Sequence, residues 1–392
     1  MEQTSATTKN VQEVTRHIDT KIERELWGRA AGRCEFSDCN RLLYKSSVTQ
    51  ERVNIAQMAH IYSFSAAGPR GRGPYSNNTE GLNDTCNLML VCYDCHRKID
   101  QDKGGSRYSA MLLKSWKEAH EFRIRVVTDI KASKKSHVLL YGSRVGDERS
   151  PLNFNAAAES MFPDWFPADD RPINLSMACS HDDSAPEFWA SEAAHLQKEF
   201  ERQVRNRSEE ANPNHFSVYA LASQPLLTLL GSLLTDKVPA SVYQLHREPR
   251  TWKWQPHPEN FVFEIVAPDD KTGTPVLVIA LSAAIEAKRV SSVISGPLAI
   301  WQLTIGEPHN DFLKSEAQLS MFRQAARKMI SKIEAAHPEI KELPIFPAMP
   351  IACAIELGRI RMPKANRPWH LYDQNNKQGN FIPALKIGTS HE

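Results

Sequence analysis

The hydrophobic and polar positions divide the sequence into two stretches of different character. Residues 34–100 are rich in Cys, His, Asn and Gly and show little periodic apolar pattern. A short helical stretch precedes them, and apolar residues at i, i+3 and i+4 spacing predict a helix over about 108–124. From Val138 onward, short apolar runs alternate with helical patterns. These patterns predict an N-terminal domain over 1–130, a basic polar linker over 131–137 and a C-terminal domain over 138–392.

The C-terminal stretch reads as strands interleaved with helices. Helices are predicted over about 186–204, 225–234 and 314–336. The apolar runs predicted as strands include HVLLYG, FSVYALAS, SVYQLH, FVFEIVA, PVLVIALSA, ISGPLAIWQLTI and IACAIEL. This alternation favours an α/β layer architecture with a mostly parallel sheet, and it runs twice, as two fused α/β halves.

Composition and charge are those of a globular protein without a membrane span. The 392 residues are 41% hydrophobic and 24% charged, an ordinary globular balance, with a net charge of +2. No run of about 18 apolar residues is present, which excludes a membrane span, and the polar N-terminus lacks the apolar core of a secretory signal. We therefore expect a cytoplasmic protein, in which any contact with nucleic acid comes from a local basic patch.

The cysteines form two closely spaced pairs in the N-terminal domain. The pairs are Cys34-x4-Cys39 and Cys92-x2-Cys95, about fifty residues apart. Four thiolates in this arrangement suit tetrahedral Zn²⁺ with closed coordination, which indicates a structural role. Cys86 has no partner at ligand spacing and is expected in the core.

Histidines and an asparagine surround the second cysteine pair. His60, Asn87 and His96, in this order around the cysteines, resemble the motif of the HNH (ββα-metal) endonucleases, over roughly residues 24–124. The resemblance implies that His60 is the general base, that Asn87 orients its ring through a hydrogen bond, and that His96 binds Mg²⁺ or another divalent cation.

One position departs from the HNH pattern. Many members have Asp or His immediately before the general base as a metal ligand, whereas this chain has Ala59. Asp100 lies four residues after His96, so on a helix both would share one face, and it is the expected substitute ligand. The alternative is an ordinary solvated carboxylate, and Asp84 and Asp94 are less favoured substitutes.

A glycine-rich loop, SAAGPRGRGPYSNNTEG, lies between His60 and Asn87. Glycine lets the backbone approach a phosphate closely, and Arg70 and Arg72 could pair with phosphate oxygens of DNA independently of base sequence. The alternative is a flexible surface loop with two solvated arginines.

Four segments of the C-terminal stretch resemble the SAVED domain, which fuses two CARF-like (Rossmann-like) halves and senses cyclic oligonucleotides. They are FSVYALASQPLLTLLGSLL, SVYQLHREPRTWKWQ, LVIALSAAI and AIELGRIRMPKANRPWHLYD. With the N-terminal motif, the chain resembles an HNH–SAVED effector nuclease of CBASS, the bacterial antiphage systems that signal through cyclic oligonucleotides. The resemblance implies a cyclic dinucleotide activator such as a cGAMP isomer, ligand-induced homo-oligomerisation from dimer to tetramer, and degradation of double-stranded DNA in the bacterial cytoplasm.

Candidate ligand contacts follow from the chemistry of a cyclic nucleotide. Strand ends and the helix start after them point to Ser223, Gln224 and Ser282. Stacking on bases and neutralisation of phosphates are the roles expected of five further residues: Trp252, Trp369, Arg247, Arg359 and Lys364. For each tryptophan the alternative is core packing, and for each basic residue a solvated surface charge.

Two other functions fit the same sequence. A restriction-type HNH nuclease would recognise specific or modified DNA through its C-terminal domain and need no nucleotide ligand. A zinc-stapled DNA-binding module would bind without cleaving, since Ala59 removes a metal ligand. The complete set of His60, Asn87 and His96 favours an enzyme over the second alternative.

Overall fold

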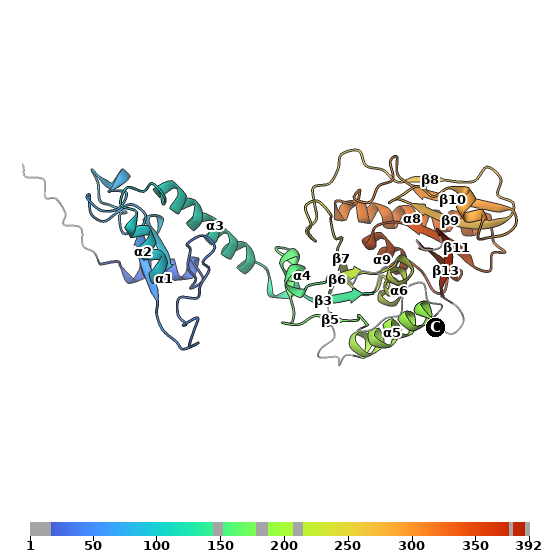
Figure 1. The fold of residues 1–392 in the computed structure, drawn as a ribbon, viewed down its shortest axis with the longest axis horizontal. Helices are drawn as coiled ribbons and strands as arrows, with labels where there is room; N and C mark the ends of the chain where they lie inside the picture. Colours follow the sequence, from blue (N-terminus) through green and yellow to red (C-terminus); the bar gives the residue numbers. More distant parts are fainter. Residues whose placement is uncertain (1–16, 144–151, 178–186, 207–214, 376–378, 389–392) are drawn as a thin grey trace, which may run out of the picture. The chain divides into compact units, whose positions relative to one another are not determined.

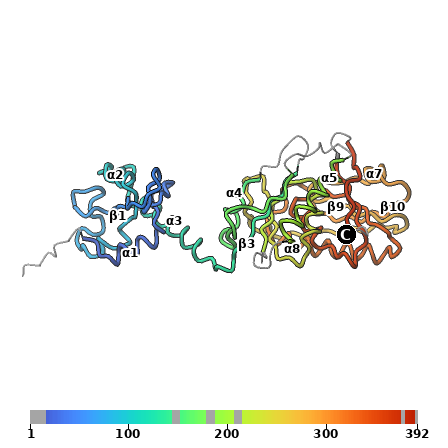
Figure 2. The backbone as a smooth tube through the Cα atoms, turned by 90° about the horizontal axis from the view of Figure 1, so that it is seen from below, coloured from blue at the N-terminus to red at the C-terminus, as the bar shows by residue number. Residues whose placement is uncertain are grey.

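The chain is divided into two compact units. The computed structural model describes residues 17–143, 152–177, 187–206, 215–375 and 379–388 (Figure 1). Unit 1 is Met1–Lys131 and unit 2 is Ala132–Glu392. Figure 2 shows this division along the backbone, with unit 1 in blue to cyan and unit 2 in green to red.

Unit 1 is built on a β-hairpin followed by a helix. Strands β1 and β2 pair antiparallel, with His60 opposite Leu88 and Ala56 opposite Cys92, and α2 begins directly after β2. The elements of unit 1 are α1 (Thr20–Arg29), β1 (Ala56–His60), β2 (Leu88–Cys92), α2 (Tyr93–Gln101) and α3 (Ala110–Thr128), with short 3₁₀ helices at Gly73–Tyr75 and Thr85–Asn87.

The core of unit 1 is small and gathers around β2. All five residues of β2 are buried, and Leu26 of α1, Ile99 of α2 and Leu113 of α3 pack in the same cluster. The side chain of Ser109 caps α3 by accepting a hydrogen bond from the amide of Leu112, which explains the start of this helix. The helix predicted over about 108–124 is thus present as α3, with shifted bounds.

Unit 2 contains two sheets, as the alternating pattern predicts. The first has the order β4-β3-β6-β7, with β5 also paired to β3, and all of its pairs are parallel. Its strands are β3 (Lys135–Gly142), β4 (Phe166–Pro167), β5 (Ile173–Asn174), β6 (Phe216–Leu221) and β7 (Ala240–Val242).

The second sheet has the order β13-β12-β11-β9-β10-β8. Its four central strands run parallel, and the two edge strands are antiparallel to their neighbours. The strands are β8 (Glu264–Val266), β9 (Thr274–Ala280), β10 (Leu298–Thr304), β11 (Leu343–Ala348), β12 (Trp369–Asn375) and β13 (Asn380–Ile387).

Two buried helices join the two sheets into one core. Helices α6 (Gln224–Leu234) and α9 (Ile351–Arg359) lie between the sheets (Figure 1), and both are apolar almost all round, as a helix buried on every side should be. They approach closely at two glycines: a Cβ on Gly231 would lie 1.9 Å from the carbonyl oxygen of Ile355, and a Cβ on Gly358 would lie 1.9 Å from that of Thr228.

Further helices cover the sheets. The predicted helix at 314–336 is present as α8 (Glu316–Ala336), whose capping box joins Ser315 and Gln318. The remaining helices are α4 (Phe154–Met161), α5 (Phe188–Phe200, continued by a π-helical turn to Arg205) and α7 (Ala287–Ser291), with a 3₁₀ helix at Ala132–Lys134. Among the described residues, no helix combines the length and the apolar character that crossing a membrane requires.

Two predictions about local structure are wrong. The run IACAIEL, predicted as a strand, forms helix α9, because a short fully apolar run fits a buried helix as well as a buried strand. Residues 131–137, predicted as a linker, include the 3₁₀ helix at Ala132–Lys134 and the start of β3, where Ser136 is buried and bonded to Ser217.

Strand β11 was not predicted, because it contains two prolines. The amide of Leu343 donates to Pro368 on the β12 side, so alternation turns Pro344 toward β9 and Pro347 toward β12. The pairing with β9 begins only at Ile345, and the pairing with β12 ends at the same residue. At each proline, the nitrogen therefore points toward a neighbouring strand with which β11 forms no ladder hydrogen bond at that position. This is why an interior strand can contain both prolines.

Candidate functional site

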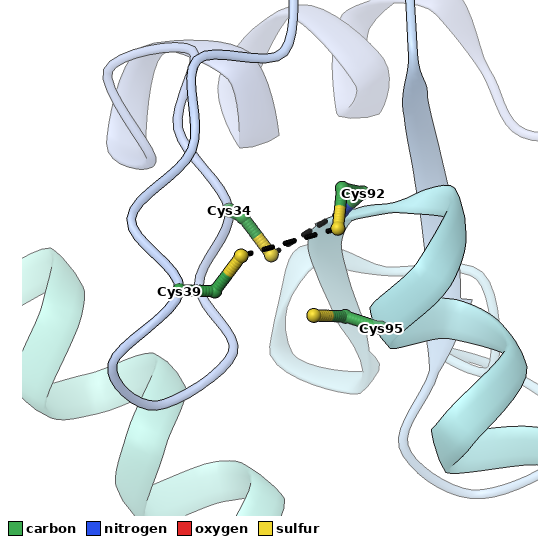
Figure 3. Close-up of side chains that lie close together, drawn as sticks. All are labelled: Cys34, Cys39, Cys92 and Cys95. Atoms are coloured by element: carbon green, nitrogen blue, oxygen red, sulfur yellow. Dashed lines mark hydrogen bonds between the residues drawn. The ribbon is translucent and has the colours of Figure 1, made fainter. Parts of the chain in front are cut away.

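The four predicted zinc ligands converge on one point in unit 1 (Figure 3). Cys34 and Cys39 lie in the loop after α1, Cys92 ends β2, and Cys95 lies in the first turn of α2. Their sulfur atoms all lie within 4.8 Å of one another, and the Sγ atoms of Cys39 and Cys92 are 3.9 Å apart. Zn–S bonds of about 2.3 Å in a tetrahedron require sulfurs about 3.8 Å apart, so the arrangement fits zinc.

The electrostatics of the cysteines favour a bound cation. Burial raises the pKa of Cys34 to about 12 and also raises the pKa of Cys95. The thiols of Cys34 and Cys95 therefore stay protonated unless a metal ion stabilises their thiolates, whereas for Cys92 burial is outweighed by hydrogen bonds from neighbouring cysteines, which lower its pKa. Asp38 and Asn40, residue types that tolerate positive φ, shape the tight loop around Cys39.

His60 lies at the end of β1 with its ring orientation fixed by Asn83. The His60 Nε2 atom is 2.9 Å from Oδ1 of Asn83, whose Nδ2 donates to the backbone oxygen of His17. Because the oxygen of the Asn83 amide faces the ring, Nε2 of His60 is the donor and Nδ1 keeps the free lone pair. Burial lowers the pKa of His60, with His96 acting in the same direction and Asn83 and Asp100 opposing. The imidazole is therefore neutral near pH 7.

Asn87 does not hold the ring of His60, contrary to the prediction. Its side chain is fully buried, its Oδ1 accepts from the amide of Tyr62, and its Nδ2 donates to the carbonyls of Tyr62 and Leu82. These three bonds use both amide hydrogens and one acceptor position of the oxygen, and two of them fix the backbone of Tyr62, two residues after His60. Asn83, four residues earlier in the same loop, makes the contact that was predicted for Asn87.

His96 and Asp100 share one face of α2, as their spacing predicts. The Nε2 atom of His96 lies 3.7 Å from Oδ2 of Asp100, and both side chains are partly exposed. Adjacent ligands of one octahedral Mg²⁺ at about 2.1 Å lie about 3 Å apart, so the two side chains would have to approach each other by less than about 1 Å to bind one cation that keeps several waters. Ala59 is buried, Asp84 caps the 3₁₀ helix that starts at Thr85, and Asp94 pairs with Arg41.

Arg70 is not presented to solvent as the predicted DNA contact. Its guanidinium donates to the backbone oxygens of Ile61 (2.6 Å), His60 (3.2 Å) and Ile99 (3.2 Å). Arg72 uses one nitrogen, Nε, on the carbonyl of Phe64. The glycine-rich loop is therefore held to the domain by its arginines.

A pocket of about 410 Å³ lies in unit 2 at the carboxyl ends of strands from both sheets. This is the edge at which parallel sheets collect ligands, because loops diverge there and helices begin there. Its lining comes from residues that end or follow β6, β7, β9, β10 and β11: Leu221, Gln244, Leu245, His246, Arg247, Arg250, Ser282, Asn310, Met349, Pro350 and Ile351.

The pocket is suited to an anion with polar groups. Arg247 and Arg250 are exposed at its rim, and the N-terminus of α9 opens into it at Ile351. The ring of His246 is fully buried, and within the described part of the chain neither ring nitrogen has a hydrogen-bond partner. Burial lowers the pKa of His246, so the ring offers one donor and one acceptor.

The lining residues all lie within the segment 196–387. That segment matches the model of the SAVED family, the "SMODS-associated and fused to various effectors sensor domain". Residues 196–387 are a SAVED domain. The two sheets of unit 2, one parallel and one mixed, fit the Rossmann-like halves that the sequence predicts for it.

Solved structures of receptors with this domain are similar to the chain. The Cap4 SAVED/CARF-domain containing receptor of Acinetobacter baumannii with the cyclic trinucleotide 2'3'3'-cAAA is 16% identical, with a TM-score of 0.42, covering 80% of this chain and 67% of its own. The Moraxella osloensis Cap4 receptor is 12% identical, with a TM-score of 0.38, covering 74% and 63%. The chain spans about two thirds of the length of these receptors. No curated protein matches the sequence.

The predicted ligand residues of the SAVED domain fall into three groups. Arg247 and Ser282 line the pocket. Trp252 is mostly buried and lines an adjoining hollow of about 280 Å³, which shares Leu245 and Arg250 with the pocket. The third group does not line the pocket: Ser223, Gln224, Arg359, Lys364 and Trp369.

The reasons differ within the third group. Gln224 supports the rim, because its Oε1 accepts from the amide of Met349, and Ser223 precedes it at the N-cap of α6. The guanidinium of Arg359 donates to three backbone carbonyls and to Glu356, and Trp369 is fully buried in the core. Lys364 is exposed in the turn before β12.

Sequence reasoning missed His246 and Arg250. Both lie in SVYQLHREPRTWKWQ, the segment that already resembled the SAVED domain. Their position in the segment that follows β7, beyond a carboxyl strand end, was the available signal.

Proposed function

We propose that the protein is a DNA endonuclease that depends on a divalent cation and is gated by a cyclic oligonucleotide. The observation that carries the proposal is the presence in one chain of a SAVED domain and of a ββα unit in which His96 and Asp100 share one face of α2 and both act electrostatically on His60 at the end of β1. The sensor domain supplies the regulation, and the ββα unit supplies the groups for hydrolysis of a phosphodiester.

His60 is the general base in this proposal. Its Nδ1 lone pair takes a proton from the attacking water, while the bond from Nε2 to Asn83 holds the ring and its tautomer. His96 and Asp100 would hold the divalent cation. When bound, the cation stabilises the negative charge that develops on the phosphate and on the leaving oxygen. The four cysteines, which fit a structural Zn²⁺, hold the loop after α1 against the start of α2.

The pocket of the SAVED domain binds the activator. Arg247, Arg250 and the positive end of the α9 helix dipole attract phosphodiester groups, and His246 offers a donor and an acceptor to a base or sugar. We propose a cyclic oligonucleotide as this ligand, with a cyclic dinucleotide of the cGAMP type as the first candidate. Binding activates the enzyme if the ligand has a higher affinity for the assembled form than for the free one.

A cleavage assay tests the proposal directly. Plasmid DNA and Mg²⁺ are incubated with the protein, alone and with a panel of cyclic di- and trinucleotides. We expect cleavage of double-stranded DNA with one ligand of the panel, accompanied by a larger assembly in light scattering. His60→Ala should lower the cleavage rate about 10²- to 10⁴-fold without changing ligand affinity.

The pocket has its own matched pair of variants. Arg250→Ala should weaken ligand binding at least about tenfold, because it removes a charge-assisted contact to the ligand. Arg171→Ala, an exposed arginine of unit 2 outside the pocket lining, should bind normally. Equal cleavage with and without ligand would contradict gating and favour a restriction-type nuclease. If the protein binds DNA but cleaves it under none of the conditions of the assay, a non-catalytic DNA-binding module is favoured.

A further inference from the structure

Arg70 forms hydrogen bonds to two elements of unit 1. Its Nε donates to the carbonyl of Ile61 and its NH2 to that of His60, at the end of β1. Its NH1 donates to the carbonyl of Ile99, on α2. One guanidinium therefore links the strand end that carries the proposed base to the helix that carries the proposed cation ligands.

The attachment to α2 lies within the proposed site. Ile99 stands between His96 and Asp100 along the helix, and its side chain is buried in the core of unit 1. The backbone amide of Arg70 also donates to the carbonyl of Lys103, just beyond the end of α2. Both the backbone and the side chain of Arg70 thus fix the loop to this helix.

The surroundings of Arg70 are adapted to this inward position. Its φ of +62° turns the chain so that the side chain enters the domain. Gly105 leaves room for it, because a Cβ there would lie 2.8 Å from Cγ of Arg70. Burial of a guanidinium is unfavourable unless its donors are satisfied, and in the partly buried Arg70 each of the three nitrogens donates to a backbone carbonyl. A surface arginine that contacts DNA needs none of these adaptations.

We propose that Arg70 is a positioning residue that sets the spacing between His60 and the pair of His96 and Asp100. The inference rests on the proposed nuclease function, and it replaces the role of Arg70 as a DNA contact. A planar guanidinium can donate to both elements at once, whereas the ammonium of a lysine is a compact point donor and cannot span them in the same geometry. Loss of the link lets the base and the cation ligands move apart.

The test compares Arg70→Met and Arg70→Lys with Arg72→Met. Arg70→Met should lower kcat of ligand-activated cleavage about 10²-fold with KM for DNA within about twofold, because misplacement of a catalytic group affects the chemical step. It should also weaken Mn²⁺ binding at the His96 site, in zinc-loaded protein, about tenfold. Arg70→Lys should show the same pattern with a smaller loss. Arg72→Met, in the same loop, should raise KM for DNA and leave the Mn²⁺ affinity unchanged.

The outcomes separate this inference from the proposed function. A rise in KM with unchanged kcat and Mn²⁺ affinity for both Arg70 variants would show a DNA contact and overturn the positioning role. If Arg70→Met loses its zinc or no longer unfolds cooperatively, it is misfolded, and the kcat and Mn²⁺ affinity of the folded Arg70→Lys variant are then used for the test. If the wild-type protein binds Mn²⁺ but cleaves no DNA with any ligand, the nuclease proposal fails. In that case the Mn²⁺ measurement still tests Arg70, because an unchanged Mn²⁺ affinity in the Arg70 variants would overturn the positioning role.

Discussion

The two units assemble their candidate sites in different ways. In unit 1, Cys92, Cys95, His96 and Asp100 come from one β2–α2 segment, and a loop adds the other two cysteines. In unit 2, the pocket draws on the ends of five strands, from Leu221 to Ile351. The first arrangement depends mainly on one local segment, to which β1 adds His60, and the second depends on the topology of parallel sheets.

The hydrophobic cores of the two units also differ, in size and in how many elements they join. The core of unit 1 is one small cluster around β2, whereas a continuous core in unit 2 runs through both sheets and the helices between them. A small core supplies little stability of its own, so unit 1 should depend on zinc and unit 2 on close packing. The following predictions test this difference, beginning with the largest effect.

Removal of one zinc ligand should unfold unit 1 and leave unit 2 folded. Structural zinc contributes about 10–16 kcal/mol to such sites, as much as the whole stability of a domain. Cys95→Ser should therefore abolish protection of the amides of β2 and α2 in hydrogen-exchange mass spectrometry, with protection of β9 and β11 unchanged. Cys86→Ser is the control, because this cysteine lies outside the cluster and is exposed rather than in the core as predicted. Full protection of β2 in Cys95→Ser would show that unit 1 does not need the metal.

A methyl group between α6 and α9 should destabilise unit 2. In Gly358→Ala the new Cβ meets the carbonyl oxygen of Thr228 at 1.9 Å, so two backbones must separate. We expect a loss of about 3 kcal/mol in the free energy of unfolding, measured with urea. Gly28→Ala in α1, where the Cβ meets nothing within 4 Å, should be neutral or stabilise unit 1 by up to about 1 kcal/mol. Equal effects of the two variants would contradict the close-packing argument.

Removal of the partner of His60 should slow the proposed reaction. Asn83→Ala frees the imidazole ring to rotate and to change tautomer, so kcat should fall about 10- to 100-fold, a range typical for groups that orient a functional histidine. Asn78→Ala, in the same loop but bonded to Glu80 and not to His60, should keep wild-type kcat. A rise in KM for DNA without a change in kcat would instead assign Asn83 to DNA binding.

Mild acid should destabilise unit 2 through His215. Burial lowers the pKa of His215 to about 4, and Arg359 and Lys134 act in the same direction. The ring stacks on Trp165 at 3.6 Å and bonds to Ser136. Because the folded pKa lies below the unfolded value of about 6.5, this contribution is complete above pH 6.5 and is lost as the pH falls toward 4, about 1 kcal/mol being lost by pH 5.5.

The variant His215→Gln isolates this contribution. Urea unfolding at pH 7.5 and 5.5 should show a smaller loss of stability for the variant than for wild type. An identical pH dependence in both proteins would show that His215 titrates normally.

Features that follow from local sequence were predictable. The spacing of Cys34, Cys39, Cys92 and Cys95 indicated a common cluster, and the pattern at 225–234 indicated α6. The spacing of His96 and Asp100 indicated a shared helix face because helical geometry is regular.

Features set by tertiary contacts were not predictable. Nothing in the glycine-rich loop shows that Arg70 turns inward, since that depends on carbonyls of β1 and α2. Arg359 looks like a basic surface residue until the loop before β7 places its carbonyls around it. The run from Ile351 to Leu357 is apolar throughout, so only its place between two sheets decides that it is a helix.

The two prolines of β11 also restrict which alternative pairings the sheet can form. A shift of β11 by one residue would turn Pro344 toward β12 and Pro347 toward β9, inside the stretches where those ladders are formed. Each proline would then remove a ladder bond, and the shift would also exchange the two faces of the strand. Misaligned sheets are thereby penalised at the central strand, so an insertion or deletion of one residue between α8 and β11 should be tolerated only where the connecting loop absorbs it.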